Sequence, residues 1–136
     1  MMNVSVYTPD RRVFEGEVNS ITAPCIEGVV TILPRHMNYV SPMDAGIVEI
    51  KKASELTTFT IGKGVLFVEN NKVTILIEEA KYEHELVELE ILKAKEKAEE
   101  IIAKGTKDEI LQARYLLRRS LVDLRMIKKR RRIGSV

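Results

Sequence analysis

The chain has 136 residues, of which 45% are hydrophobic and 31% are charged, a composition typical of a globular protein with a packed core. No run approaches the roughly 18 apolar residues of a membrane-spanning helix, and the amino terminus lacks the basic leader and apolar block of a signal peptide, so we expect neither a membrane span nor secretion. Cys25 is the single cysteine, which excludes an internal disulfide, and with only two histidines the chain lacks the ligand spacing of an ordinary zinc site.

The first part of the chain, residues 3–79, consists of short runs rich in β-branched residues that are separated by turn residues. Runs that recur every 8–12 residues or so are typical of an antiparallel sandwich or barrel. No segment with a helical period interrupts them, which disfavours a parallel sheet with crossover helices. The expected strands lie at residues 4–7, 12–15, 18–22, 29–32, 47–50, 56–61, 65–68 and 73–77.

After Lys81 the period changes to that of helices. Residues 83–103 contain no glycine or proline, and Gly105 then suits the left-handed position that ends a helix. Thr106 and Glu109 have the spacing of a capping box and predict a second helix from about Lys107 to about Arg131. Helices joined by so short a turn must lie antiparallel, so we expect a helical hairpin over 82–136. The preceding residues, 1–81, form the expected β domain, a sandwich or a barrel. The expected apolar faces are Val87, Ile91, Ala94, Ala98 and Ile101 on the first helix, and Ile110, Ala113, Leu117, Leu121, Leu124 and Ile127 on the second.

The seam between the two expected helices is lined by small residues. Ala94, Ala98 and Ala113 stand where a tightly held pair would carry leucine. At about 25 cal/mol per Å² of apolar surface, such a seam favours the docked hairpin by only a few kcal/mol. We hypothesise that the hairpin can open; the alternative is a permanently packed appendage.

Charge is distributed unevenly along the chain. The net charge of +2 is composed of −2 over residues 1–81, −3 over residues 82–106 and +7 over residues 107–136. On a helix, Arg114, Arg118, Arg125, Lys129 and Arg132 share one face and form a positive ridge, which favours an acidic partner over a role in solubility alone. The basic residues that we expect to contact a partner are Arg114, Arg118, Arg119, Arg125, Lys128, Lys129, Arg130, Arg131 and Arg132.

We find no catalytic constellation in the sequence. Gly62-Lys63-Gly64 lacks the earlier glycine and the following Ser/Thr of a phosphate loop and predicts a hairpin turn. His36 and His84 have no carboxylate or cysteine nearby, and no nucleophile elbow is present, so we predict that the chain is not an enzyme by itself. The alternative is a nucleic-acid-binding β-barrel with a basic helical arm. Against it, the β half is slightly acidic and only 5% of the residues are aromatic.

Several short patterns, in their order along the chain, resemble the epsilon subunit of F-type ATP synthases. They are Tyr7-Thr8-Pro9-Asp10, Pro24, Glu27-Gly28, Ile32-Leu33-Pro34-Arg35-His36, Gly46-Ile47-Val48-Glu49-Ile50, Gly64-Val65-Leu66-Phe67-Val68, Asn71 and Val73-Thr74-Ile75-Leu76, followed by the helical hairpin. The resemblance covers almost the whole chain. It implies an amino-terminal ten-stranded antiparallel β-sandwich followed by a carboxyl-terminal two-helix antiparallel hairpin.

The resemblance also implies a role in the rotor, or central stalk. The sandwich of this family binds the gamma subunit and the c-ring and couples ion translocation to ATP synthesis, at the cytoplasmic face of the bacterial plasma (inner) membrane. Carried onto this chain, the c-ring contacts are Glu27, Gly28, Val29, Arg35 and His36, and Thr8 matches a position at the gamma interface. The family often has glycine where this chain has Arg35.

In bacterial members of the family, the two helices can leave the sandwich, enter the alpha/beta catalytic hexamer and block ATP hydrolysis. The resemblance therefore implies an inhibitory second helix, with the basic residues given above as its contacts. Some members also bind ATP through an Ile/Leu-Asp-x-x-Arg-Ala motif, which corresponds here to residues 86–91. Val87 replaces the Asp and Glu90 replaces the Arg, so we expect no ATP cofactor on the hairpin.

Overall fold

The structure is a computed structural model, and it describes residues 1–134, with side chains described as far as residue 128. The chain divides into two compact units, Met1–Lys81 and Tyr82–Val136. The first contains strands joined by turns and loops, and the second contains the last residue of the tenth strand and the helices.

The first unit contains nine strands and most of a tenth. Alternation of buried and exposed residues runs along most of them, as expected for strands with one face on a core. The strands are β1 (Met2–Tyr7), β2 (Arg12–Val18), β3 (Ser20–Cys25), β4 (Gly28–Ile32), β5 (Tyr39–Met43), β6 (Gly46–Lys52), β7 (Glu55–Ile61), β8 (Gly64–Glu69), β9 (Lys72–Ile77) and β10 (Ala80–Tyr82).

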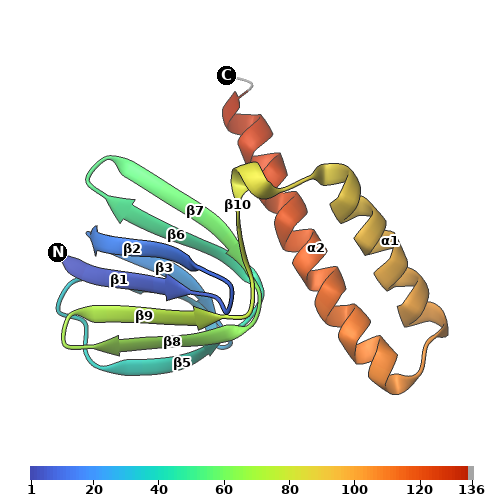
Figure 1. The fold of residues 1–136 in the computed structure, drawn as a ribbon, viewed down its shortest axis with the longest axis horizontal. Coiled ribbons are helices and arrows are strands. Elements are labelled where there is room, and N and C mark those ends of the chain that lie inside the picture. The colour runs from blue at the N-terminus through green and yellow to red at the C-terminus, as the bar shows by residue number, and fades with distance from the viewer. Residues whose placement is uncertain (135–136) are drawn as a thin grey trace. The chain divides into compact units, whose positions relative to one another are not determined.

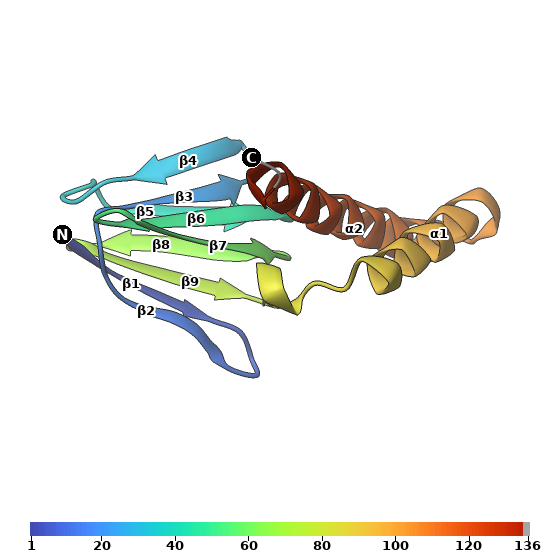
Figure 2. The ribbon, with the colours of Figure 1, turned by 90° about the horizontal axis from the view of Figure 1, so that it is seen from above.

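The strands form one sheet in the order β10-β7-β6-β3-β5-β8-β9-β1-β2, with β4 paired to β3 beside this path. The sheet folds over where β3 meets β5, because only Cys25 and Met43 are paired there (Figures 1 and 2). The predicted sandwich followed by a helical hairpin is confirmed. One pairing, between β1 and β9, is parallel, so the sheet is mixed.

The core of the sandwich is apolar and closed to solvent. Its largest buried side chains come from strands on both sides of the fold, and each has less than 2% of its surface exposed; they include Ile21, Ile32, Phe59, Leu66 and Ile75. Burial of each such side chain stabilises the folded state by about 1.5–3 kcal/mol.

Two strands were absent from the sequence prediction. β5 contains Pro42, which normally argues against a strand, and β10 has only three residues. The run at 18–22 is divided at Asn19 between β2 and β3.

The hairpin turn expected at Gly62-Lys63-Gly64 is wrong, because β7 and β8 are not neighbours in the sheet. These residues instead connect two separate parts of the sandwich.

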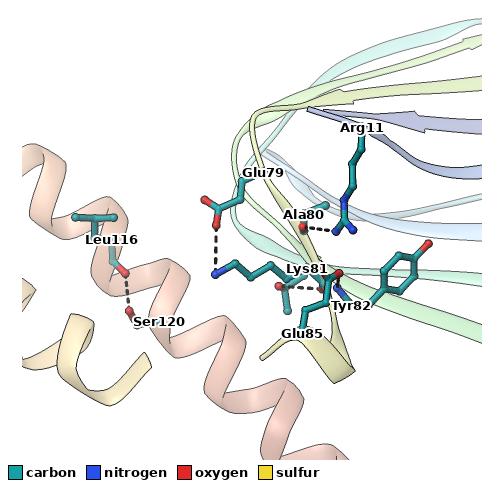
Figure 3. Close-up of polar contacts among 9 residues, drawn as sticks. Arg11, Glu79, Ala80, Lys81, Tyr82, Glu85, Leu116 and Ser120 are labelled. Atoms are coloured by element: carbon teal, nitrogen blue, oxygen red, sulfur yellow. Dashed lines mark hydrogen bonds and ion pairs between the residues drawn. The ribbon is translucent and has the colours of Figure 1, made fainter. Parts of the chain in front are cut away.

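Strand β10 is anchored by polar contacts as well as by its pairing with β7. The Arg11 guanidinium donates to the carbonyl of Ala80 at 3.2 Å, and the Thr60 hydroxyl donates to the carbonyl of Lys81 at 3.4 Å. Lys81 also forms an ion pair with Glu79 at 3.6 Å (Figure 3). The end of the sandwich unit is therefore fixed to its sheet up to the residue where the helical unit begins.

The second unit is a hairpin of α1 (Glu88–Lys104) and α2 (Lys107–Gly134). A short 3₁₀ turn, Glu83–Glu85, precedes α1, and the Tyr82 amide donates to Glu85 Oε1 at 2.9 Å in this turn (Figure 3). The first helix begins five residues later than predicted, because Leu86 and Val87 both have extended backbone angles.

The buried faces of the hairpin differ in part from the predicted stripes. Ile91, Ala98 and Ala113 are buried as expected, but Ala94 is exposed, and Leu121 is 43% exposed. On α1 the side of the helix that is shielded from solvent includes the half-buried Lys95 and Ile102 instead of Ala94. Each helical residue turns by about 100°, so a modest rotation of α1 moves Ala94 out of the seam.

Gly105 has a different role from the one predicted. Its φ of −85° and ψ of 175° are extended, so the left-handed position expected there is wrong. Its amide donates to the Ile101 carbonyl at 2.7 Å, and a Cβ at this position would lie 2.7 Å from that oxygen. The site selects glycine because of this close approach. The Glu109 amide donates to the Thr106 hydroxyl at 3.4 Å, as the capping pattern predicts.

Candidate partner-binding surfaces

The first candidate surface begins at the turn between β3 and β4. Ile26 and Glu27 form a two-residue loop, followed by Gly28 with φ of 135°, a conformation that favours glycine. The Ile26 amide donates to the Pro42 carbonyl at 3.1 Å, which ties the turn to β5. Ile26 is 63% exposed and Val29 is 73% exposed, so apolar side chains project here beside the Glu27 carboxylate.

The second part of this surface is the connection from β4 to β5. Arg35 has φ of 65°, a left-handed conformation that costs a non-glycine residue free energy, and this explains why glycine suits the position. The Arg35 amide donates to Asn71 Oδ1 at 2.9 Å, and the His36 amide donates to the Leu33 carbonyl at 3.2 Å. The His36 ring contacts Tyr39 edge to face, with centroids 6.0 Å apart. These bonds fix the loop while leaving the Arg35 side chain exposed.

Thr8 lies in the turn between β1 and β2. Its amide donates to the Arg11 carbonyl at 2.9 Å, and its hydroxyl accepts a hydrogen bond from the Arg11 amide at 3.2 Å. The hydroxyl therefore stabilises its own turn. This local bond is a sufficient structural reason for threonine at the position.

The structure separates the predicted contact residues into two groups. The pairings of Cys25 with Met43 and of Met43 with Gly64 place the Glu27 turn at the end of the sandwich where β1 reaches Tyr7 and Thr8. The Arg35 loop lies at the other end, where Asn71 also bonds the Met1 carbonyl. The two groups are connected by β4, whose five residues span about 16 Å.

Exposed apolar side chains accompany both groups and were missed by the sequence analysis. Leu33 is 56% exposed, Met37 is 76% exposed and Val40 is 63% exposed. Their position in or beside turns, where no core face is available, is the signal that could have identified them.

The third candidate surface is the cationic face of α2, defined by Arg114, Arg118, Arg125 and Lys128. All four side chains are exposed. At 100° per residue they lie within a sector of about 80° around the helix. The Arg118 guanidinium lies 5.9 Å from the centroid of the Tyr115 ring, a cation–π contact along the helix.

Other basic residues of the predicted ridge differ from this group. Arg119 is only 6% exposed, because it lies about 100° around the helix from Arg118. Lys129, Arg130, Arg131 and Arg132 belong to α2 by their backbone, but their side chains lie outside the described residues. Leu111 is 64% exposed and borders the cationic face, which therefore mixes charge with apolar surface.

The segment that corresponds to the nucleotide motif, residues 86–91, forms the start of α1. Leu86 is buried, and Val87 is the residue that caps the helix. Glu88 and Glu90 occupy the first turn, where carboxylates complement the positive end of the helix dipole. A phosphate group at this helix end would meet two carboxylates.

In the part of the chain that the structure describes, no group of three or more His, Cys, Asp or Glu side chains is placed to hold a metal ion. Cys25 is buried, with 7% of its surface exposed. No described helix combines the length and the apolar character needed to cross a bilayer.

Comparisons with known proteins identify the fold and its relatives. Residues 1–83 match the family model described as ATP synthase, Delta/Epsilon chain, beta-sandwich domain. An ATP synthase epsilon chain of Halalkalibacterium halodurans is 34% identical over 109 residues, 80% of this chain and 82% of that protein. One from Clostridium kluyveri is 31% identical over 131 residues, 94% of this chain and 98% of that protein. A chain of the Euglena gracilis mitochondrial ATP synthase structure has the same fold, with a TM-score of 0.78 and 22% identity over 86% of this chain and 75% of its own length.

A β-sandwich that carries a helical hairpin, in a protein with these relatives, defines the class of non-catalytic subunits of rotary ATP synthases. The chain belongs to the family of ATP synthase epsilon chains. It is a subunit of the complex and not an enzyme by itself, and the nucleic-acid-binding alternative is not supported.

Proposed function

We propose that this chain is a rotor subunit of the central stalk, in which the sandwich links the gamma subunit to the c-ring and the helical hairpin inhibits ATP hydrolysis. Its family supports membership of the complex. The solved structure with the same fold is an assembly of OSCP, F1 and c-ring. In this proposal the chain is peripheral, at the cytoplasmic face of the bacterial plasma membrane.

The observation that carries the inhibitory part is the exposed cationic face of α2. Four cations in one narrow sector of a helix are complementary to an acidic surface, and the acidic partner in this proposal is the alpha/beta catalytic hexamer. Because Arg119 is buried, the contacts are Arg114, Arg118, Arg125 and Lys128, with Lys129 to Arg132 continuing the same helix.

The composition of the hairpin supports its opening. The apolar residues buried on the two helices include the small Ala98 and Ala113 as well as Ile91, Val122, Met126 and Ile127, while Leu111 and Leu116 are exposed by 64% and 51%. Alanine removes little apolar surface from water, so Ala98 and Ala113 themselves contribute little to the docking of the two helices. In this proposal the hairpin exchanges these contacts for contacts with the hexamer.

The decisive experiment compares the ATP hydrolysis rate of the assembled complex with the full chain and with a chain that ends at Lys104. We expect the truncation to raise hydrolysis several-fold while the subunit still assembles. An unchanged rate, with assembly demonstrated by co-purification of the gamma subunit, would refute the inhibitory role.

A charge variant distinguishes the effect of the cationic side chains from the effect of removing the whole second helix. We expect Arg114→Ala, Arg118→Ala and Arg125→Ala combined to relieve inhibition, because three charge-assisted contacts are lost. Lys93→Ala, Lys97→Ala and Lys104→Ala combined remove the same charge from exposed positions of α1 and are the matched control. Equal effects of the two triple variants would show that net charge alone matters, and the proposed face would be wrong.

For the sandwich, we assign the c-ring contact to Glu27, Gly28, Val29, Arg35 and His36, and the gamma contact to Thr8. The c-ring residues lie at the two ends of β4, so a contact that includes all of them must extend along this strand. ATP binding by the hairpin is not expected, because Glu88 and Glu90 stand in the first turn of α1.

A further inference from the structure

Several strands of the sandwich have an edge that lacks a neighbouring strand over most of its length, and they differ in how that edge is protected. β5 is paired with β3 only through Cys25 and Met43, but it contains Pro42, whose carbonyl already accepts the Ile26 amide. β2 presents the exposed side chains of Arg12, Glu15 and Glu17. β10 has three residues, and its Ala80 carbonyl already accepts a hydrogen bond from Arg11. Charge and short length are the usual protections against pairing with another chain. β4 has neither, because its five residues, Gly28 to Ile32, are all uncharged.

The direction of the main-chain groups of β4 follows from its register. Cys25 pairs with Gly28 across the two-residue turn, so this pair and the alternate pair Ala23 with Val30 exchange hydrogen bonds. The carbonyl of Pro24 points away from β4, since it accepts a hydrogen bond from the Asp44 amide at 3.2 Å on the side of β5. The residue opposite Pro24 is Val29, whose N–H and C=O therefore point away from β3.

The same alternation applies one step further along β4. Thr31 lies opposite Thr22, and their hydroxyl oxygens are 3.0 Å apart, as expected for a pair whose side chains approach closely without main-chain bonds. Val29 and Thr31 thus direct two N–H and two C=O groups to the open edge. No backbone partner from the described residues, 1–134, lies on that side.

The side chains around this edge are also suited to a protein partner. Val29 is 73% exposed, and the apolar residues that flank the strand, Ile26 and Leu33, are exposed by 63% and 56%. An uncharged edge with unused main-chain groups is a template for one more strand.

We propose that the open edge of β4 receives an extended, uncharged segment of a neighbouring stalk subunit as an additional antiparallel or parallel strand. The hydrogen bonds come from the main chain of Val29 and Thr31, and Ile26 and Leu33 contact the side chains of the added strand. The inference rests on the proposed function, in which the sandwich contacts another subunit of the stalk. It explains how one partner reaches both ends of β4, near Glu27 and near Arg35.

The first test uses proline at a position where the fold tolerates it. Thr31→Pro removes an N–H that points away from β3, so the β3–β4 bonds remain, while an added strand loses a bond and meets the proline ring. Thr31→Val removes the bond to Thr22 but keeps the N–H and is the matched control. The affinity of each variant is measured by titration onto ATP synthase depleted of this subunit. We expect Thr31→Pro to bind about tenfold more weakly than the unmodified chain, and Thr31→Val to bind within about twofold of it. Equal affinities of the two variants would overturn the proposal.

The second test needs no variant and so does not depend on the folding of Thr31→Pro. We expect the amides of Val29 and Thr31 to exchange rapidly with solvent in the free chain and about 100-fold more slowly in the complex, whereas those of Val30 and Ile32 are protected in both. Unchanged exchange at Val29 and Thr31 in a chain that is fully bound overturns strand addition but leaves the stalk function intact. Concentration-dependent protection in the isolated chain would identify a second copy as the occupant and also overturn it. If the unmodified chain does not bind the depleted complex, the proposed function itself is wrong.

Discussion

At the scale of single residues, the sandwich depends on positions where backbone segments approach closely. A Cβ on Gly64 would lie 2.3 Å from the Leu76 carbonyl oxygen and 2.8 Å from the Ile77 Cα. Both are main-chain atoms of the paired strand β9, which cannot move without breaking the ladder. Gly16, on β2, would place a Cβ 3.8 Å from the Phe14 ring, an ordinary contact distance.

We therefore expect Gly64→Ala to lower the free energy of unfolding of the sandwich by about 3 kcal/mol. Gly16→Ala is the control, with an expected change within about 0.5 kcal/mol. Urea denaturation followed by circular dichroism measures both. Similar midpoints for the two variants would show that the close approach at Gly64 relaxes at little cost.

Asn71 connects three segments that are distant in sequence. Its Oδ1 accepts the Arg35 amide at 2.9 Å, its Nδ2 donates to the Met1 carbonyl at 2.8 Å, and its carbonyl accepts the Asn3 amide at 3.2 Å. Asn70 precedes it in the same turn, and both have a positive φ, 49° for Asn70 and 63° for Asn71.

We expect Asn71→Ala to destabilise the chain by about 1–2 kcal/mol more than Asn70→Ala. Both variants pay the left-handed backbone cost, but only the first loses the two side-chain bonds. When the two variants are compared by amide hydrogen exchange, the Arg35 amide should exchange faster in Asn71→Ala but not in Asn70→Ala. A slow Arg35 amide in that variant would mean that the loop is held by other contacts.

At the scale of elements, the turn of the hairpin is fixed by main-chain and capping contacts. The Ile110 amide donates to the Thr106 carbonyl at 2.8 Å, and the Thr106 hydroxyl caps the Glu109 amide. The main chain of Gly105 packs against the end of α1. These contacts fix the reversal of the chain although the buried side chains Ala98 and Ala113 are small.

We expect Thr106→Ala to destabilise the first turn of α2 by about 1 kcal/mol, because an uncapped amide replaces a bonded one. Thr106→Ser keeps the hydroxyl and should retain the stability. Hydrogen exchange at Glu109 and Ile110 reports the change directly. If the alanine and serine variants exchange equally fast, the cap contributes nothing to the hairpin.

At the scale of the whole molecule, the two units differ in the means by which they are stabilised. The sandwich has a closed apolar core that includes Ile21, Phe59, Leu66 and Ile75. Its last strand is bound by Arg11 and Thr60 from within the same unit. The family model likewise covers only residues 1–83.

We expect a chain that ends after Glu83 to fold by itself with a cooperative thermal transition, since all of these core residues remain. Circular dichroism and the dispersion of amide resonances measure this. A broad, non-cooperative transition would show that the sandwich requires the helices for its fold.

The sequence was informative wherever the relevant signal is local. Alternation and turn residues identified eight of the strands, and the 3.6-residue period with Thr106 and Gly105 identified the hairpin. The strand at β5 escaped, because Pro42 argues against a strand unless its partner β8 is known. Arg119 was placed among the contacts because a charge pattern does not reveal which side of a helix is covered.

The amino-acid sequence by itself determined the division into a sandwich and a hairpin, the family resemblance and the concentration of positive charge in the last helix, because each depends on residues that are close in the chain. Only the tertiary structure decided that the two halves of the expected contact surface lie at opposite ends of β4, and that this strand has an open edge. Both depend on which distant strands pair, and pairing is selected by the packing of the whole core.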